Sequence, residues 1–185
     1  MIDASLVERA ARGDRAAFDQ LARSRATTLF NVARMILRED DLAGDAMQEA
    51  LVRAWRDLPM LRDVARFDGW LHRLLVRACY DQARRKRRWR FDVPWTDVDV
   101  QSGEDDARSL ADRDQLGRAL ARLPVEQRAV LVLRYWLDLS QAEIAETLAI
   151  PVGTVKSRAN AGIAALRAVI EADMRLSAQP RSRTT

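Results

Sequence analysis

Residues 140–158 read SQAEIAETLAIPVGTVKSR and carry a strong local signal for the fold. This stretch opens with Ser140 and, three residues later, Glu143, which is the capping-box pattern at the start of a helix. Counted from Gln141, apolar residues fall at positions four, eight, ten and fifteen, and position five is an alanine small enough to let a second helix approach. An Ala-Ile-Pro turn at 149–151 separates the two halves. This spacing predicts a helix-turn-helix.

The first turn of the second helix carries short or cationic side chains on its outward face. Such groups can enter a major groove and reach guanine edges or phosphates. The candidate contacts to duplex DNA are Gly153, Thr154, Lys156, Ser157 and Arg158. An ordinary helical hairpin with a polar face shares the apolar spacing, but the capping box and the polar first turn favour DNA binding.

The surrounding sequence is helical in both directions. Residues 115–172 fit a domain of four helices, in which Pro124 begins the second. Toward the N-terminus, apolar residues repeat with a helical period over about 14–37, 41–57 and 68–89. Few glycines and prolines interrupt these patterns, so we expect an all-α protein.

Charge is segregated along the chain. Residues 1–90 hold 19 basic and 13 acidic residues, net +6, whereas residues 91–114 hold 2 basic and 8 acidic ones, net −6. Residues 115–172 and 173–185 are each net +2. Since 91–114 also lacks helical periodicity until Leu110, we expect a flexible acidic linker between two small domains, 1–90 and 115–172, with a disordered tail over 173–185.

The predicted helix over 68–89 carries two stripes. One is apolar and should be buried, and the other is basic, interrupted by Asp81. The helix runs into RRKRRWR at 84–90, which has six basic residues in seven. A solvated, dipole-complementing helix end would need fewer charges, and Trp89 and Phe91 lie among them. A basic stripe with aromatics is typical of proteins that follow a nucleic-acid backbone and stack on unpaired bases.

The composition argues against most enzyme chemistry. The single cysteine, Cys79, and the single histidine, His72, cannot form a disulfide, a zinc site or a Ser-His-Asp triad, unless His72 alone served as a base. No Gly-rich phosphate loop, apolar run of membrane length or secretion signal is present. We therefore expect a cytoplasmic protein with no cofactor, no metal and no membrane insertion.

Several motifs together resemble the extracytoplasmic-function (ECF) sigma factors. LPVEQR at 123–128, SQAEIA at 140–145 and GTVKSR at 153–158 resemble the fourth conserved region of that family. DAMQEALVRAW at 45–55 resembles its second region, and FDGWL at 67–71, with the arginine-rich helix end, resembles the segment that engages the −10 element. The resemblance covers nearly the whole chain except the linker and the tails.

The resemblance implies a region 2 helical bundle and a region 4 helix-turn-helix domain that reads the −35 element and docks on the polymerase flap. It places contacts to the clamp helices of core RNA polymerase at Asp45, Gln48, Glu49 and Arg53. It places contacts to the melted −10 strand, beside the loop 59–67, at Trp70, Arg73, Arg77, Arg84, Arg85, Arg87 and Arg88. Chemistry would stay with polymerase, and an anti-sigma protein commonly holds such factors inactive.

Two departures from the family pattern bear on promoter choice. Arg77 stands where the family often has asparagine, and the run 159–162 replaces a more usual leucine and arginine and ends in Gly162. A mid-helix glycine disfavours the helix by up to ~1 kcal/mol, so we expect looser −35 binding or a shifted register there. The acidic linker is either a solubilising spacer or a mimic of nucleic acid inside polymerase.

Two other classes of protein compete with this interpretation. An operator-binding regulator would use the helix-turn-helix but leave residues 45–55 and the basic stripe without a role. A nucleic-acid enzyme would need Asp45, Glu49 and Asp81 to bind metal, although exposed carboxylates at such helical spacing are usually solvated.

Overall fold

A computed structural model of the chain describes residues 4–92 and 116–178, and every regular element in those two ranges is helical. The N-terminal bundle consists of α1 (Ala4–Ala11), α2 (Arg15–Leu37), α3 (Asp40–Asp57) and α4 (Phe67–Asp92). Two 3₁₀ turns, Leu58–Met60 and Val64–Arg66, connect α3 to α4. The C-terminal bundle consists of a helical segment over 116–121, α6 (Val125–Tyr135), α7 (Gln141–Leu148) and α8 (Val152–Ala178). The all-α expectation is confirmed.

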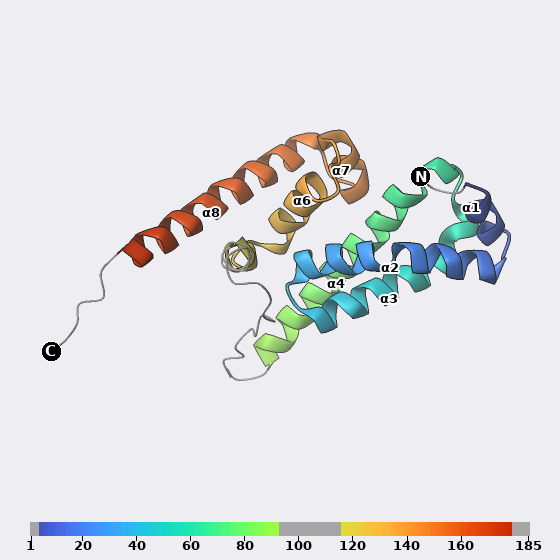
Figure 1. Cartoon of the computed structure of the whole chain (residues 1–185), viewed down its shortest axis with the longest axis horizontal. Coiled ribbons are helices and arrows are strands. Elements are labelled where there is room, and N and C mark those ends of the chain that lie inside the picture. The colour runs from blue at the N-terminus through green and yellow to red at the C-terminus, as the bar shows by residue number, and fades with distance from the viewer. Residues whose placement is uncertain (1–3, 93–115, 179–185) are drawn as a thin grey trace.

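The helices of the N-terminal bundle begin and end at recognisable signals. The Asp14 carboxylate accepts a hydrogen bond from the Ala17 backbone N–H at 3.1 Å and caps α2. At the other end of α2, Arg38 adopts the left-handed conformation (φ 63°) and turns the chain into α3. Figure 1 shows α2, α3 and α4 lying alongside one another, with α1 at one end. The sequence patterns did not predict α1, which buries Val7 and Ala10.

The core of this bundle depends on alternating small and large side chains. Four alanines of α3 are completely buried, which lets this helix lie close to both α2 and α4. Large buried side chains such as Leu29, Ile36 and Phe67 fill the remaining space. The predicted apolar stripe of α4 is buried from Leu71 to Cys79, whereas Trp70 stays partly exposed.

Both long helices extend beyond their predicted ends. α4 continues through residues 91 and 92, where the sequence predicts the start of the linker, and the rest of the predicted linker lies outside the described residues. The prediction of a tail from residue 173 was wrong for 173–178, because α8 continues to Ala178. No glycine or proline stands between Gly162 and Pro180, so nothing in that segment stops the helix.

The two bundles touch one another. α7 packs against α4, and α6 packs against α2 and α4. In Figure 1, α7 lies between the start of α8 and the N-terminal bundle, while the far half of α8 extends away from both. This arrangement places the helix-turn-helix beside the basic helix of the other bundle.

Candidate nucleic-acid interface

The helix-turn-helix forms as its sequence indicates. The Ser140 hydroxyl accepts a hydrogen bond from the Glu143 backbone N–H (3.2 Å), and the Glu143 carboxylate accepts one from the Ser140 N–H (2.7 Å). Hydrogen bonding of this carboxylate to the Ser140 side chain and to the Ser140 backbone N–H holds the pKa of Glu143 below its usual value. Ala149, in the left-handed conformation (φ 53°), ends α7, and the carbonyl of Pro151 accepts the first hydrogen bonds of α8. Local hydrogen bonding therefore sets both ends of the turn.

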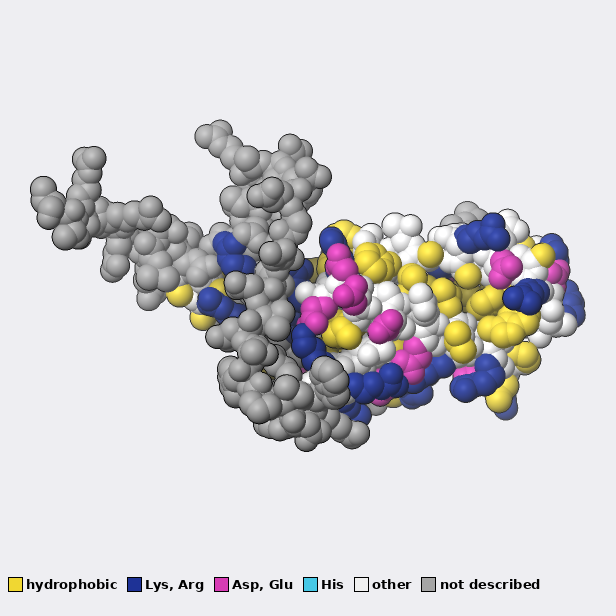
Figure 2. All heavy atoms as spheres, turned by 90° about the horizontal axis from the view of Figure 1, so that it is seen from below, with side chains coloured by type: hydrophobic (Ala, Val, Ile, Leu, Met, Phe, Trp, Pro, Cys, Tyr) yellow, Lys and Arg dark blue, Asp and Glu magenta, His cyan; other side chains and the backbone are white. Residues whose placement is uncertain are grey.

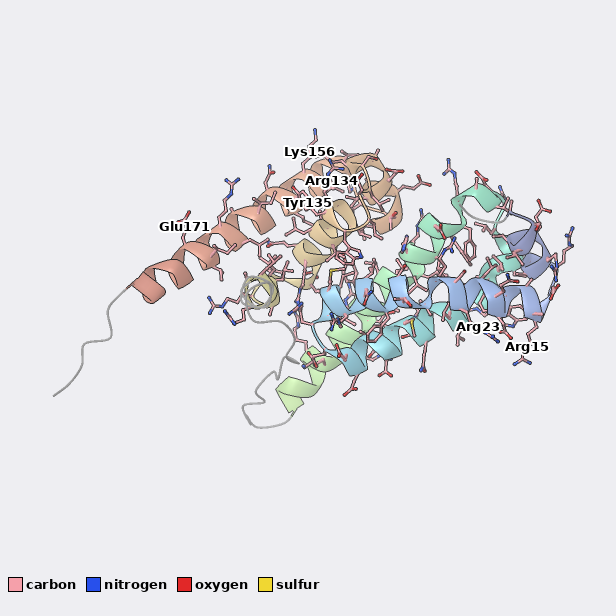
Figure 3. The ribbon with its side chains drawn as sticks, viewed as in Figure 1. Arg15, Arg23, Arg134, Tyr135, Lys156 and Glu171 are labelled. Atoms are coloured by element: carbon pink, nitrogen blue, oxygen red, sulfur yellow. The ribbon has the colours of Figure 1, made fainter. Side chains whose placement is uncertain are left out.

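The predicted −35 contacts lie together on the first two turns of α8. Gly153, Lys156 and Ser157 are exposed, and Thr154 and Arg158 are half-buried. Lys156 points away from the N-terminal bundle (Figure 3). The Ser157 hydroxyl donates to the Thr154 carbonyl at 3.0 Å, so its proton is engaged within the helix. The structure thus groups these five positions on one end of one helix.

Gly162 has a packing role that the sequence interpretation missed. It is buried, and a Cβ added there would lie 2.9 Å from Cδ1 and 3.3 Å from Cγ of Leu131 on α6. The glycine therefore permits the close approach of α8 to α6. The spacing of residues along α8 could not predict this contact, because Leu131 lies on another helix.

Among the predicted −10 contacts of α4, Arg73, Arg77 and Arg84 share one side of the helix, whereas Arg85 faces α3 and lies 3.5 Å from the Glu49 carboxylate. Arg77, Arg84, Arg85 and Arg87 are exposed, Arg73 is half-buried, and the side chain of Arg88 lies outside the described residues. The half-buried Trp70 packs beside Phe67, with ring centroids 6.0 Å apart. Three of the arginines line a shared cavity of about 250 Å³; they are Arg73, Arg77 and Arg84. α4 thus presents a basic face with an aromatic ring near its first turn.

The predicted polymerase contacts divide into two pairs. Asp45 and Gln48 are exposed. Glu49 and Arg53 are half-buried, and one terminal nitrogen of Arg53 donates to Glu49 (2.6 Å) and to Asp81 on α4 (3.0 Å). The hydrogen bond with Asp81 is the main reason that the pKa of Arg53 is raised. Glu49 and Arg53 therefore cross-link α3 to α4, and Asp81, which had looked like an interruption of the basic stripe, is their partner.

Apolar side chains beside these residues were not among the predicted contacts. Val52 is 70% exposed and Trp55 39% exposed, and the Trp55 ring packs against Phe18 with centroids 5.0 Å apart. Seen from below, the N-terminal bundle shows hydrophobic side chains next to acidic and basic ones (Figure 2). Large apolar side chains that stay exposed on α3 indicate a binding surface, and their exposure can be seen only in the tertiary structure.

The single histidine and the single cysteine are both shielded from solvent in the N-terminal bundle. His72 is largely buried, and burial lowers its pKa, while Cys79 is buried and burial raises the pKa of its thiol to about 12. Over 4–92 and 116–178, no three or more His, Cys, Asp or Glu side chains are grouped as metal ligands would be. Among the helices described, none is both long and apolar enough to cross a membrane.

Comparisons with known proteins agree with this geometry. Residues 21–89 match the family model "Sigma-70 region 2", and residues 113–166 match "Sigma-70, region 4". The ECF RNA polymerase sigma factor SigM of Mycobacterium tuberculosis is 39% identical over 157 residues, which cover 84% of this chain and 78% of that protein. SigL of the same species, also an ECF sigma factor, is 34% identical over 169 residues, covering 89% and 95%.

Two solved structures share this fold over most of the chain. CnrH, in complex with the cytosolic domain of CnrY, is 28% identical and superposes with a TM-score of 0.67, covering 92% of this chain and 98% of CnrH. The sigma factor RpoE of Bartonella quintana, in complex with the anti-sigma factor NepR, has a TM-score of 0.68 at 23% identity, covering 84% and 98%, and shows the same fold. With its two sigma-70 regions and these relatives over most of its length, the chain belongs to the ECF family of RNA polymerase sigma factors and is a transcription initiation factor.

Proposed function

We propose that this chain directs core RNA polymerase to promoters by reading the −35 element with the start of α8 and the −10 element with the basic face of α4. The exposed face at the start of α8, held by the capping box and the tight turn, is the observation that carries this proposal. A helix N-terminus of this kind presents backbone and side-chain donors to phosphates and base edges in a major groove.

In the −35 interaction, Lys156 and Arg158 have separate roles. Lys156, which is exposed and points away from the N-terminal bundle, contacts the phosphate backbone, while the half-buried Arg158 reaches a base edge. Thr154 and Ser157 add short polar contacts. Gly153 borders open space, so DNA can come close to the backbone at this position. The residue bounds of this domain are 115 to 178 in our proposal, extended from 172 by the observed end of α8.

In the −10 interaction, the arginines of α4 neutralise the phosphates of the unpaired strand, and Trp70 stacks on a base. Unstacking a base costs a few kcal/mol, which stacking and phosphate contacts can offset. The domain that performs this step spans residues 1–90, and 91–114 links it to the other domain.

On the polymerase side, the exposed Asp45 and Gln48 contact the clamp helices, with Val52 and Trp55 as an apolar centre. Glu49 and Arg53 position this surface through Asp81 and contribute less direct contact. The second domain docks on the flap. The chain has no catalytic site of its own in this scheme, and it acts where polymerase acts, in the cytoplasm.

We also propose regulation by an anti-sigma protein. The structure of RpoE contains the anti-sigma factor NepR, and the structure of CnrH contains the cytosolic domain of CnrY. The polymerase-facing and promoter-facing surfaces of this chain are the ones that such a partner would cover.

The first test is reconstitution with purified core RNA polymerase, followed by run-off transcription on a library of genomic fragments. We expect stoichiometric binding and new, defined start sites. Tight duplex binding by the chain alone, without binding to polymerase, would instead identify an operator-binding regulator.

Matched variants then test the assigned surfaces. Arg158→Ala should weaken discrimination at one base pair of the −35 element by ~1–3 kcal/mol, whereas Arg167→Ala, an equal charge loss on an exposed part of α8, should not. Asp45→Lys should reduce binding to polymerase, with Asp19→Lys on exposed α2 as its control. Unchanged base preference in Arg158→Ala, or equal polymerase binding by the two lysine variants, would refute the respective assignment.

A further inference from the structure

The cavity of about 250 Å³ beside α4 is lined mainly by cations. α4 contributes Arg73, Arg77 and Arg84, and α3 contributes Arg53. α7 forms another part of the wall with the buried Thr147 and with Leu148. Among the described residues that line the cavity, the one carboxylate is that of Asp81. Several guanidinium groups around one hollow create a positive potential that attracts an anion.

The carboxylate in the wall does not neutralise this potential. Asp81 accepts a hydrogen bond from Arg53 at 3.0 Å, and the same terminal nitrogen of Arg53 donates to Glu49 at 2.6 Å. These three groups therefore compensate one another's charge. The cations of α4 remain to be matched.

The three arginines of α4 are poorly matched by carboxylates. Nη2 of Arg73 lies 3.9 Å from the Glu146 carboxylate, and Glu146 makes its shorter contact, 2.6 Å, with Arg66. In the part of the chain that the structure describes, neither Arg77 nor Arg84 forms an ion pair. At least two positive charges in this wall thus lack a counter-charge.

Two hydrogen-bond donors of the same wall also lack acceptors. The Tyr80 hydroxyl and the Nε–H of Arg73 are both buried, and neither finds a hydrogen-bond partner within the described residues. A buried donor without an acceptor costs about 1–3 kcal/mol, so buried polar groups are almost always bonded. A ligand that brings acceptors to this wall would remove that cost.

The Tyr80 hydroxyl keeps its proton and can act as a donor. Burial raises the pKa of Tyr80 to about 12. The positive charges of Arg158 and Arg84 oppose this rise, and the negative charge of Glu126 adds to it. At neutral pH the group is therefore a neutral O–H that donates to an anion and does not repel it.

Charge, donors and size together select the class of ligand. Guanidinium groups bind phosphate oxygens through paired N–H donors, and a phosphate anion offers more acceptor oxygens than a carboxylate or a chloride ion. Sites for drug-sized ligands have volumes of about 300–1,000 Å³. The smaller volume here fits a compact anion better than a whole nucleotide.

We propose that the cavity between α4 and α7 binds a small phosphate anion with at least two negative charges, such as free diphosphate. Arg77 and Arg84 supply the counter-charge, and Tyr80 and Arg73 supply the buried hydrogen bonds. The bound anion occupies arginines assigned above to the −10 strand, so it competes with that strand. This competition rests on the function proposed for α4, whereas the binding itself does not.

Calorimetric titration of the full-length chain with sodium diphosphate tests the site, in a buffer without phosphate or divalent cations. We expect saturable binding of one diphosphate per chain. Sodium chloride added to the same ionic strength should give no saturable signal, because simple screening has no stoichiometry. No saturable binding at up to about 10 mM diphosphate would overturn the proposal.

A matched pair of variants separates the cavity from the general charge of α4. Arg77→Gln and Arg87→Gln each remove one exposed positive charge from this helix, but Arg87 does not line the cavity. Arg77→Gln should weaken diphosphate binding roughly 3- to 10-fold, and Arg87→Gln less than about 2-fold. Equal losses in the two variants would show attraction to a basic helix in place of a site, and would overturn the proposal.

Tyr80→Phe tests the buried donor. This change keeps the ring and removes the hydroxyl, so diphosphate should bind roughly 10-fold more weakly. The melting temperature without ligand should stay the same or rise, because the hydroxyl that is lost had no partner in the protein. An unchanged affinity for diphosphate would place the anion outside this cavity and overturn the assignment.

A last measurement separates free phosphate anions from the phosphates of DNA. Diphosphate should displace a fluorescent single-stranded oligothymidylate of about 20 nucleotides from the full-length chain, and more strongly than sodium chloride at equal ionic strength. Equal displacement by the two salts would overturn the competition. Failure of the wild-type chain to start transcription with core polymerase would refute the proposed function, and the calorimetric result does not depend on it.

Discussion

Replacing Gly162 by alanine tests whether the close packing of α8 against α6 holds the recognition helix in place. Gly162 lies in the middle of α8 and is buried against Leu131 of α6. An added methyl group would lie 2.9 Å from Leu131 Cδ1, inside normal van der Waals contact. Leu131 is itself only 4% exposed, so its side chain has little room to move away.

Two opposing effects set the size of the change. Helix propensity favours alanine over glycine by ~1 kcal/mol, and overpacking of a filled core costs ~1–3 kcal/mol. We expect Gly162→Ala to lower the free energy of unfolding of the C-terminal bundle by roughly 1 kcal/mol net. Gly153→Ala on the same helix meets no atom within 4 Å, so it should be neutral or slightly stabilising.

The assay is urea unfolding of both variants and the wild type, followed by helical circular dichroism and by hydrogen exchange of α6 and α8. The expected difference between the two variants is about 1–3 kcal/mol, with faster exchange in α8 of Gly162→Ala. If Gly162→Ala were as stable as Gly153→Ala, the close approach of α8 to α6 would not limit the packing, and the reasoning would be refuted.

Two other perturbations test local features. Ser140→Ala removes the capping bond to the Glu143 N–H and should lower the free energy of unfolding in urea by ~1 kcal/mol. Ser157→Ala removes a hydroxyl that bonds within its own helix, so it should lower this free energy by less. Equal losses would contradict the capping role. Burial lowers the pKa of His72, so the folded state disfavours its charged form, and stability present above pH 6.5 is lost as the pH falls below that value. Because the chain has one histidine, His72→Gln should flatten the dependence of the melting temperature on pH between about 7 and 5, and a curve parallel to that of the wild type would exclude this source.

The helix-turn-helix could be predicted from the sequence because its signals are local. The capping box spans four residues, 140–143, and the apolar spacing of the helix-turn-helix follows from the helical period alone. The buried stripe of α4 could be predicted for the same reason, since residues on one face of a helix recur at fixed intervals. The five −35 candidates share one end of α8 because they are neighbours in the sequence.

Relations between distant residues could not be predicted in this way. Asp81 looked like a break in a basic stripe until the structure placed it 3.0 Å from Arg53, and Gly162 looked like a weak point in a helix until it lay against Leu131. In both cases the partner lies on another helix, and helical periodicity carries no information about which faces meet.

Local sequence patterns thus predicted α2, α3, α4 and the helix-turn-helix, their apolar faces and the family of this protein, since hydrogen bonding, capping and hydrophobic period act within a few residues. Which side chains of opposite charge meet could be learned only from the folded protein. Glu146 and Arg66 are 80 residues apart in the chain and 2.6 Å apart in space. Such a pair forms because packing of whole helices brings two exposed side chains together, and packing depends on the shape of every face at once.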